Sequence, residues 1–278
     1  MEENNMDTKL NFILKEEKHP IYLRCAQLLL PSGNIVTIRE QNGNDDDVIS
    51  SFGNEAQDAT VINRFIAGLI IKNTFPFAKT KEKMSEKEIL KVKLKDKYFI
   101  LLASRIFSLG PVVLFEWDWK DGSGLKVPYE EDLSLYLWNY QEEFPEPGQP
   151  DYFEKRMTPY FGFDEDGRRE ITLQDGRKVR YKAMDGESEN YILGLPVEQR
   201  TVNAALKARR LEVFEGSSWQ LVVNFSGFNP RLMSEIRKDV NTYDEQFDGI
   251  TEIENPKTGQ PLNLSLLAIP DFFFPREI

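Results

Sequence analysis

The sequence predicts an α+β fold made of two related modules, each built from β-hairpins and helices. Three observations lead to this fold class. The 278 residues are enough for two separate cores. The order hairpin, helices, hairpin occurs twice, and a proline-rich stretch separates the two occurrences. We therefore expect a polar leader over 1–20, a first module over 21–142, a linker over 143–160 and a second module with an aromatic tail over 161–278.

The first module shows both strand-like and helical apolar patterns. Two strand-prone runs flank a Pro-Ser-Gly-Asn turn at 31–34, which indicates a hairpin. Apolar residues between 61 and 70 recur every three or four positions, as in a helix packed on a core. Asp96 is expected to cap a further helix, which a Gly-Pro pair at 110–111 ends. The predicted elements are a hairpin over 28–38, a helix start at 45–52, a helix over 60–71, a loop or short helix over 79–95, a helix over 96–109 and a hairpin over 112–128.

The second module repeats this order. An Asp-Gly turn at 175–176 joins two strand-prone runs, and an acid-led segment follows it. Asn229 before Pro230 is a strong helix start, because asparagine caps a helix well and proline suits its first position. The predicted elements are a hairpin over 171–181, a segment over 185–193, a helix over 201–214, a helix from 229 to 240 and a closing hairpin over 250–267.

This repetition predicts an internal duplication. Residues 28–138 and 171–267 are expected to superimpose, with Arg105 and Arg237 on equivalent turns of equivalent helices and holding carboxylates in similar ways. The alternative is that hairpins and helices alternate by chance, as they do in many α+β proteins.

Composition narrows the classes of function. The formal charge is −11, and the basic residues are scattered among acids, which disfavours binding to nucleic acid or to an anionic membrane. The single cysteine, Cys25, excludes an intramolecular disulfide. Residues 1–10 do not resemble a secretory signal, and no apolar run approaches the length of a membrane span. We expect a protein made in the cytosol that does not insert into membranes.

The sequence contains few candidates for catalysis. Nucleophilic catalysis normally needs a base, and the only histidine, His19, lies beside a proline in the leader. Cys25 is expected to be a small core residue. Asp164, Glu165 and Asp166 are typical of a turn, although a carboxylate-only enzyme such as a wall hydrolase remains an alternative. We assign no catalytic, cofactor-binding or metal-binding residue, and no cofactor.

Aromatic residues concentrate around the linker and at the end of the chain. Tryptophan, tyrosine and phenylalanine anchor protein interfaces, and segments this rich in proline rarely contribute a large core. We therefore predict interface positions here, with burial in the module cores as the alternative. The candidates are Tyr152, Phe153, Tyr160, Phe161, Phe272, Phe273 and Phe274.

Several segments carry a resemblance to a known family: Leu30-Pro31-Ser32-Gly33, the helix entry and helix over 93–110, Glu131-Asp132-Leu133-Ser134, the hairpin over 173–181, the turn over 255–259 and Phe272-Phe273-Phe274-Pro275. Together they resemble the tailed-phage baseplate protein family, of the T-even phage baseplate hub protein type. Members of that family often carry paired cysteines at two hairpin turns, as in a zinc ribbon. This chain has no cysteine at 117–122 or 255–259, so metal binding is not carried over.

The resemblance implies a structural or assembly component of the baseplate or tail hub of a tailed phage or related contractile injection machine. Such a component acts through contacts with other baseplate, hub or tail proteins in a multi-subunit assembly, and it is not an enzyme. It is made in the bacterial host cytoplasm and ends in the particle. The alternative is a tail-assembly chaperone that binds tape-measure or tube proteins and then leaves.

Overall fold

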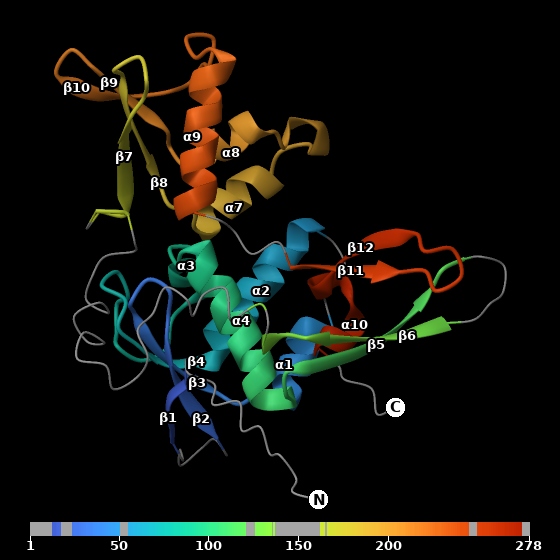
Figure 1. The fold of residues 1–278 in the computed structure, drawn as a ribbon. Coiled ribbons are helices and arrows are strands. Elements are labelled where there is room, and N and C mark those ends of the chain that lie inside the picture. Colours follow the sequence, from blue (N-terminus) through green and yellow to red (C-terminus); the bar gives the residue numbers. More distant parts are fainter. Residues whose placement is uncertain are drawn as a thin grey trace, which may run out of the picture.

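The computed structural model describes residues 13–17, 24–50, 55–120, 126–134, 136, 162–164, 166–244 and 249–273. In this part of the chain, helices combine with two four-stranded and two two-stranded sheets (Figure 1). All strand pairs are antiparallel. The α+β class is therefore confirmed. No helix in the described ranges is both long and apolar enough to cross a bilayer.

The first sheet has the strand order β1-β2-β3-β4. The predicted hairpin is confirmed as β2 and β3, with Leu29 opposite Ile35. A strand that the sequence did not suggest, β4, follows α2 directly and pairs with β3. Its isoleucines continue the helical spacing of the preceding residues, so the apolar pattern alone does not show where the helix ends and the strand begins. The strands are β1 (Ile13–Glu17), β2 (Cys25–Leu29), β3 (Ile35–Arg39) and β4 (Ile70–Asn73).

Helices cover one side of this sheet. They are α1 (Gly43–Ile49), α2 (Glu55–Leu69), α3 (Glu86–Ile89) and α4 (Leu94–Leu109). The N-cap of α4 is Lys93, and Asp96 is its third residue, so the expectation that Asp96 caps this helix is wrong. Its Oδ1 instead accepts the backbone N–H of Ser32, at 2.9 Å, in the β2–β3 turn. Helix α4 is buried on nearly every face and therefore forms the centre of the first core.

The end of the chain completes this first core. The hairpin of β5 (Val112–Asp118) and β6 (Lys126–Asp132) lies beside that of β11 (Ile250–Glu254) and β12 (Pro261–Ser265), as Figure 1 shows. Between them, the Tyr129 hydroxyl donates to the Glu254 carbonyl at 2.9 Å. Next, η2 (Leu266–Ala268) and α10 (Pro270–Phe273) place Phe272 and Phe273 in the core. The expected second module over 161–278 is therefore corrected, because 250–273 pack on the first module.

The second core forms between one sheet and one long helix. The sheet has the order β10-β9-β8-β7. Helix α9 begins at the predicted Asn229, whose Oδ1 accepts the N–H groups of Arg231 and Leu232. Its apolar face packs on the sheet in a separate cluster (Figure 1). The elements are β7 (Arg168–Thr172), β8 (Lys178–Lys182), α7 (Gly186–Leu193), η1 (Val197–Gln199), α8 (Val202–Ala208), β9 (Glu212–Glu215), β10 (Ser218–Leu221) and α9 (Pro230–Tyr243).

The helix predicted over 201–214 is too long. Helix α8 ends at Ala208, and the backbone of Arg210 then adopts a left-handed conformation with φ of 52°. A helix cannot continue through such a residue. The chain turns back and enters β9, where Val213 joins the second core as a strand residue.

The two halves of the chain have a similar order of elements. However, the elements and the two arginines do not correspond one to one as an internal duplication would predict. Along the chain, both halves run through a hairpin, two helices, a third strand, a long helix and a second hairpin, but α3 stands in the first half where β10 stands in the second. The second hairpin of the second half, β11–β12, packs on the first module. Arg105 is buried and donates to the carbonyls of Phe272, Gly110 and Val112, whereas Arg237 is exposed. The prediction that these arginines hold carboxylates alike is wrong for Arg105. Duplication itself stays a prediction.

Candidate functional site

The two modules meet where α4 and α7 begin. The N–H of Leu94 donates to the Met184 carbonyl at 2.9 Å, and the N–H of Glu187 donates to the Leu90 carbonyl at 2.9 Å. A Cβ at Gly186 would lie 2.9 Å from the Cα of Leu90, so this close approach requires glycine. The beginnings of both helices are therefore held against each other by the backbone.

A buried ion pair reinforces this contact. Lys97 of α4 is 0% exposed, and its ammonium contacts the carboxylate of Glu189 in α7. The Tyr98 hydroxyl donates to the other oxygen of Glu189 at 2.9 Å. An unpaired buried charge is costly, so the contacts among these three side chains hold the two helices against each other.

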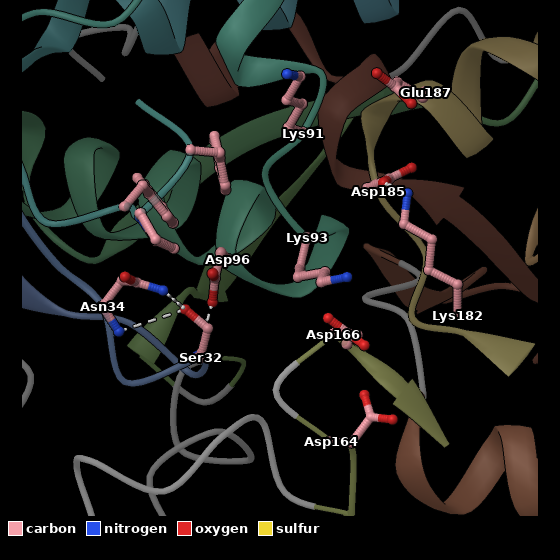
Figure 2. A pocket seen from close by; sticks show the side chains of 14 residues that line it. Ser32, Asn34, Lys91, Lys93, Asp96, Asp164, Asp166, Lys182, Asp185 and Glu187 are labelled. Atoms are coloured by element: carbon pink, nitrogen blue, oxygen red, sulfur yellow. Dashed lines mark hydrogen bonds and ion pairs between the residues drawn. The ribbon is translucent and has the colours of Figure 1, made fainter. Parts of the chain in front are cut away.

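A cleft of about 520 Å³ opens beside this contact. Residues of the first module form one wall and residues of the second module form the other (Figure 2). The lining from the first module is Ser32, Asn34, Phe75, Pro76, Phe77, Lys91, Lys93 and Asp96, and that from the second is Asp164, Asp166, Gly167, Lys182, Asp185 and Glu187. The cleft therefore combines an aromatic surface with charges of both signs.

Asp96 is the most deeply buried charge of the cleft. Its side chain is 0% exposed, and in the described part of the chain its Oδ2 has no hydrogen-bond donor. Burial raises the pKa of Asp96 from 3.8 to about 6, and hydrogen bonding to Ser32 offsets part of this shift. Burial therefore destabilises the ionised form of Asp96 relative to the protonated form.

This burial predicts a pH-dependent stability. Because the folded-state pKa of Asp96 lies above the unfolded value, the native state binds more protons between pH 4 and 6 and loses stability as pH rises through that window. An asparagine at this position would keep an acceptor for Ser32 without the charge. We expect Asp96→Asn to stabilise the protein by about 2–3 kcal/mol at pH 7 and by close to nothing at pH 4.

Chemical denaturation at both pH values checks this prediction. The exposed cleft residue Asp166 provides the matched control, since Asp166→Asn should change the free energy of unfolding little at either pH. An equal loss of stability from Asp96→Asn at pH 4 and pH 7 would contradict the argument from burial.

Lys93 is a second charged residue of the cleft lining whose pKa is shifted. Burial lowers the pKa of Lys93 below its usual value, and the nearby carboxylate of Asp185 opposes this shift. Asp185 is already occupied, because its Oδ2 pairs with Lys182 and its Oδ1 accepts from the N–H and hydroxyl of Ser188. Within the described ranges, Lys93 has no ion pair or side-chain hydrogen bond. Figure 2 shows it extending toward Asp166 and Lys182.

The structure brings together residues that the sequence did not group. Asp164 and Asp166, noted as turn acids, line the cleft together with Asp96. Lys93, Lys182 and Asp185 were not identified as site residues, since no spacing in the sequence links them. In the described part of the chain, no group of three or more His, Cys, Asp or Glu side chains is arranged to hold a metal ion.

The predicted interface aromatics have two different outcomes. Phe272 and Phe273 are buried in the first core, which agrees with the alternative of burial in a module core, and their place at an interface stays a prediction. Phe273 packs edge-on against Phe65 of α2, Arg105 of α4 donates to the Phe272 carbonyl, and α10 contacts β5. The remaining candidates, Tyr152, Phe153, Tyr160, Phe161 and Phe274, lie outside the described residues, as do His19 and Glu165.

Fold and cleft together define a two-module α+β protein with a charged and aromatic cleft between its modules. Comparisons of the chain with protein-family models, with curated proteins and with solved structures found no match.

Proposed function

We propose that this chain is a structural or assembly component of the baseplate or tail hub of a tailed phage or related contractile injection machine, acting through protein–protein contacts. Its partners would be other baseplate, hub or tail proteins. The resemblance of 30–33, 93–110 and 255–259 to the baseplate family supports this proposal.

A group of exposed apolar residues on the β9–β10 hairpin supports a role in protein–protein contacts. Phe214 and Leu221 of the β9–β10 hairpin are 40% and 50% exposed, and Val223 just beyond is 71% exposed. Phe214 lies opposite Trp219, with ring centroids 5.2 Å apart. These residues lie on the sheet face opposite Val213, which packs in the core with α9. Neighbouring exposed apolar side chains of this kind mark protein interaction surfaces.

This surface predicts a loss of assembly without a loss of folding. We expect Phe214→Ser combined with Leu221→Ser to shift the free energy of unfolding by less than about 1 kcal/mol, because Phe214 is already 40% exposed and Leu221 50% exposed. Incorporation into particles should fall, since interface anchors each contribute about 1–2 kcal/mol or more to binding. Gln220→Ser, on the same strand, is the control.

Quantitative mass spectrometry of particles purified from the organism that encodes the chain is the decisive measurement. The chain should be present together with tube, sheath or hub proteins, and the double variant should be depleted relative to Gln220→Ser. Presence only in assembly intermediates would favour the chaperone alternative. Lytic activity that Asp164→Asn abolished would favour the carboxylate-only enzyme instead.

A further inference from the structure

Strand β10 lies at the edge of the second sheet, and in the described part of the chain no strand pairs with its outer side. The N–H of Val222 donates to the Leu211 carbonyl at 2.8 Å, which makes these two residues a hydrogen-bonded pair. Hydrogen-bonded and non-hydrogen-bonded pairs alternate along antiparallel strands, so the N–H and C=O groups of Trp219 and Leu221 point away from β9. These two residues therefore offer backbone donors and acceptors to a further strand.

This edge lacks the features that usually keep sheet edges from pairing with other chains. The other edge strands of the two four-stranded sheets, β1, β4 and β7, each contain at least one lysine, arginine or glutamate. Strand β10 contains none, and residues 216–229 include no charged residue and no proline. Charged side chains and prolines on edge strands normally prevent pairing with another chain. Among these edges, β10 is therefore the one most open to a second strand.

The side chains along this edge have the character of an interface. Leu221 and Val223 are exposed, and Trp219 is partly exposed beside Phe214. The centres of interfaces are depleted of charge and enriched in aromatic residues, and residues 216–229 have both properties. The β9–β10 hairpin lies at the end of the second module that is farther from the first module (Figure 1).

The charges beside β10 favour a second copy of this chain as the partner. The chain carries a formal charge of −11, so two copies repel each other on approach. On the sheet face beside β10, however, Arg168 and Arg180 both contact the carboxylate of Glu212, and the Arg180 guanidinium lies 4.5 Å from the centroid of the Trp219 ring. Interactions between exposed charges fall off over about 8–10 Å at physiological ionic strength. Two β10 strands can therefore approach without acidic groups meeting at the contact.

We propose that two copies of this chain pair antiparallel through β10, which joins their second sheets across a twofold axis. The outward N–H and C=O groups of Trp219 and Leu221 then hydrogen-bond to the outward groups of the other copy, and apolar side chains of both copies lie side by side. A twofold axis presents the same residues from both sides, which suits an uncharged apolar strand. This inference deepens the contact role proposed above for the β9–β10 hairpin and rests on that hairpin being an interaction surface.

Sedimentation equilibrium of the purified full-length protein tests the pairing. A contact of this small size should give a dimer with a dissociation constant of roughly 1–100 µM. Leu221→Lys places an ammonium group from each copy near the twofold axis and should weaken the dimer by at least about 10-fold. Val197→Lys adds the same charge at a residue of η1 that is 71% exposed, and it should leave the dissociation constant unchanged.

A second variant tests the backbone pairing without an added charge. Leu221→Pro removes an N–H that points away from β9, so the hairpin keeps its own hydrogen bonds while the contact between copies loses a donor from each. It should also weaken the dimer by about 10-fold or more. Circular dichroism shows whether each variant is folded.

Amide hydrogen exchange followed by NMR reads out the pairing directly. Protection of the Trp219 and Leu221 amides should rise with protein concentration, because their N–H groups are bonded only in the dimer. The Val222 amide, which is bonded to Leu211 within one copy, should be protected at every concentration.

Three results would overturn the proposal. One is a monomer at all concentrations up to about 500 µM. Another is a dimer that both Leu221→Lys and Leu221→Pro leave unchanged, since the contact would then lie elsewhere. The third is protection of Trp219 and Leu221 in the monomer, which would show that another part of the same chain covers this edge. A monomeric protein that is present in particles would refute the pairing alone, whereas a dimer that is absent from particles would refute the baseplate role alone.

Discussion

Replacing Glu189 by alanine is expected to lower the free energy of unfolding by about 3–5 kcal/mol. The change leaves the Lys97 ammonium, which is 0% exposed, without its counter-charge, and it also removes the acceptor of the Tyr98 hydroxyl. The loss comes chiefly from the uncompensated buried charge rather than from a strong attraction in the intact pair. Chemical denaturation followed by circular dichroism measures it directly.

Two controls separate burial from the mere loss of an ion pair. Glu86→Ala breaks the pair between Glu86 and Arg64, whose side chains are about half exposed, and should cost under about 1 kcal/mol. Lys97→Met combined with Glu189→Leu removes both buried charges, so it should recover much of the stability that Glu189→Ala loses. A similar cost for Glu189→Ala and Glu86→Ala would contradict the buried position of Lys97.

Local signals predicted most of the secondary structure. The turn at 31–34 and the Asn229 cap each act within a few residues, and the structure has the hairpin and helix where these signals put them. Strands β4 and β9 were missed because Ile70 and Val213 continue the spacing of the helices before them. Only pairing with β3 and β8, a tertiary interaction, distinguishes strand from helix there.

The candidate site was much less predictable. Lys97 and Glu189 are 92 residues apart, so a helix pattern cannot show that this lysine is buried. The cleft likewise combines the β2–β3 turn, the start of α4 and the β8–α7 connection. Asp96 was noted only as a helix cap, although packing makes it the most deeply buried charge of the cleft lining. A site that forms only when segments far apart in the sequence pack together cannot be predicted from the spacing of residues.

Replacing Phe272 by alanine is expected to cost about 3–5 kcal/mol, as for other phenylalanines in protein cores. Its side chain is 0% exposed, and its ring contacts that of Phe273 at a centroid distance of 4.8 Å. The Arg105 guanidinium donates to its carbonyl, which fixes the backbone of α10 against α4. The surrounding helices cannot collapse into the space that a deleted ring leaves, so the cavity adds to the lost burial.

The same variant separates burial from the interface role that the sequence suggested for this residue. If Phe272 anchors a partner, Phe272→Ala should leave the melting temperature of the purified protein unchanged and reduce its recovery in particles. Burial predicts the reverse order of effects: a lower melting temperature in the isolated chain, with any loss of incorporation following from unfolding. Phe214→Ala, at an exposed phenylalanine, should shift stability by no more than about 0.5 kcal/mol and serves as the matched control. Equal melting temperatures for the two variants would contradict the burial of Phe272 in the first core and would favour its predicted role at an interface.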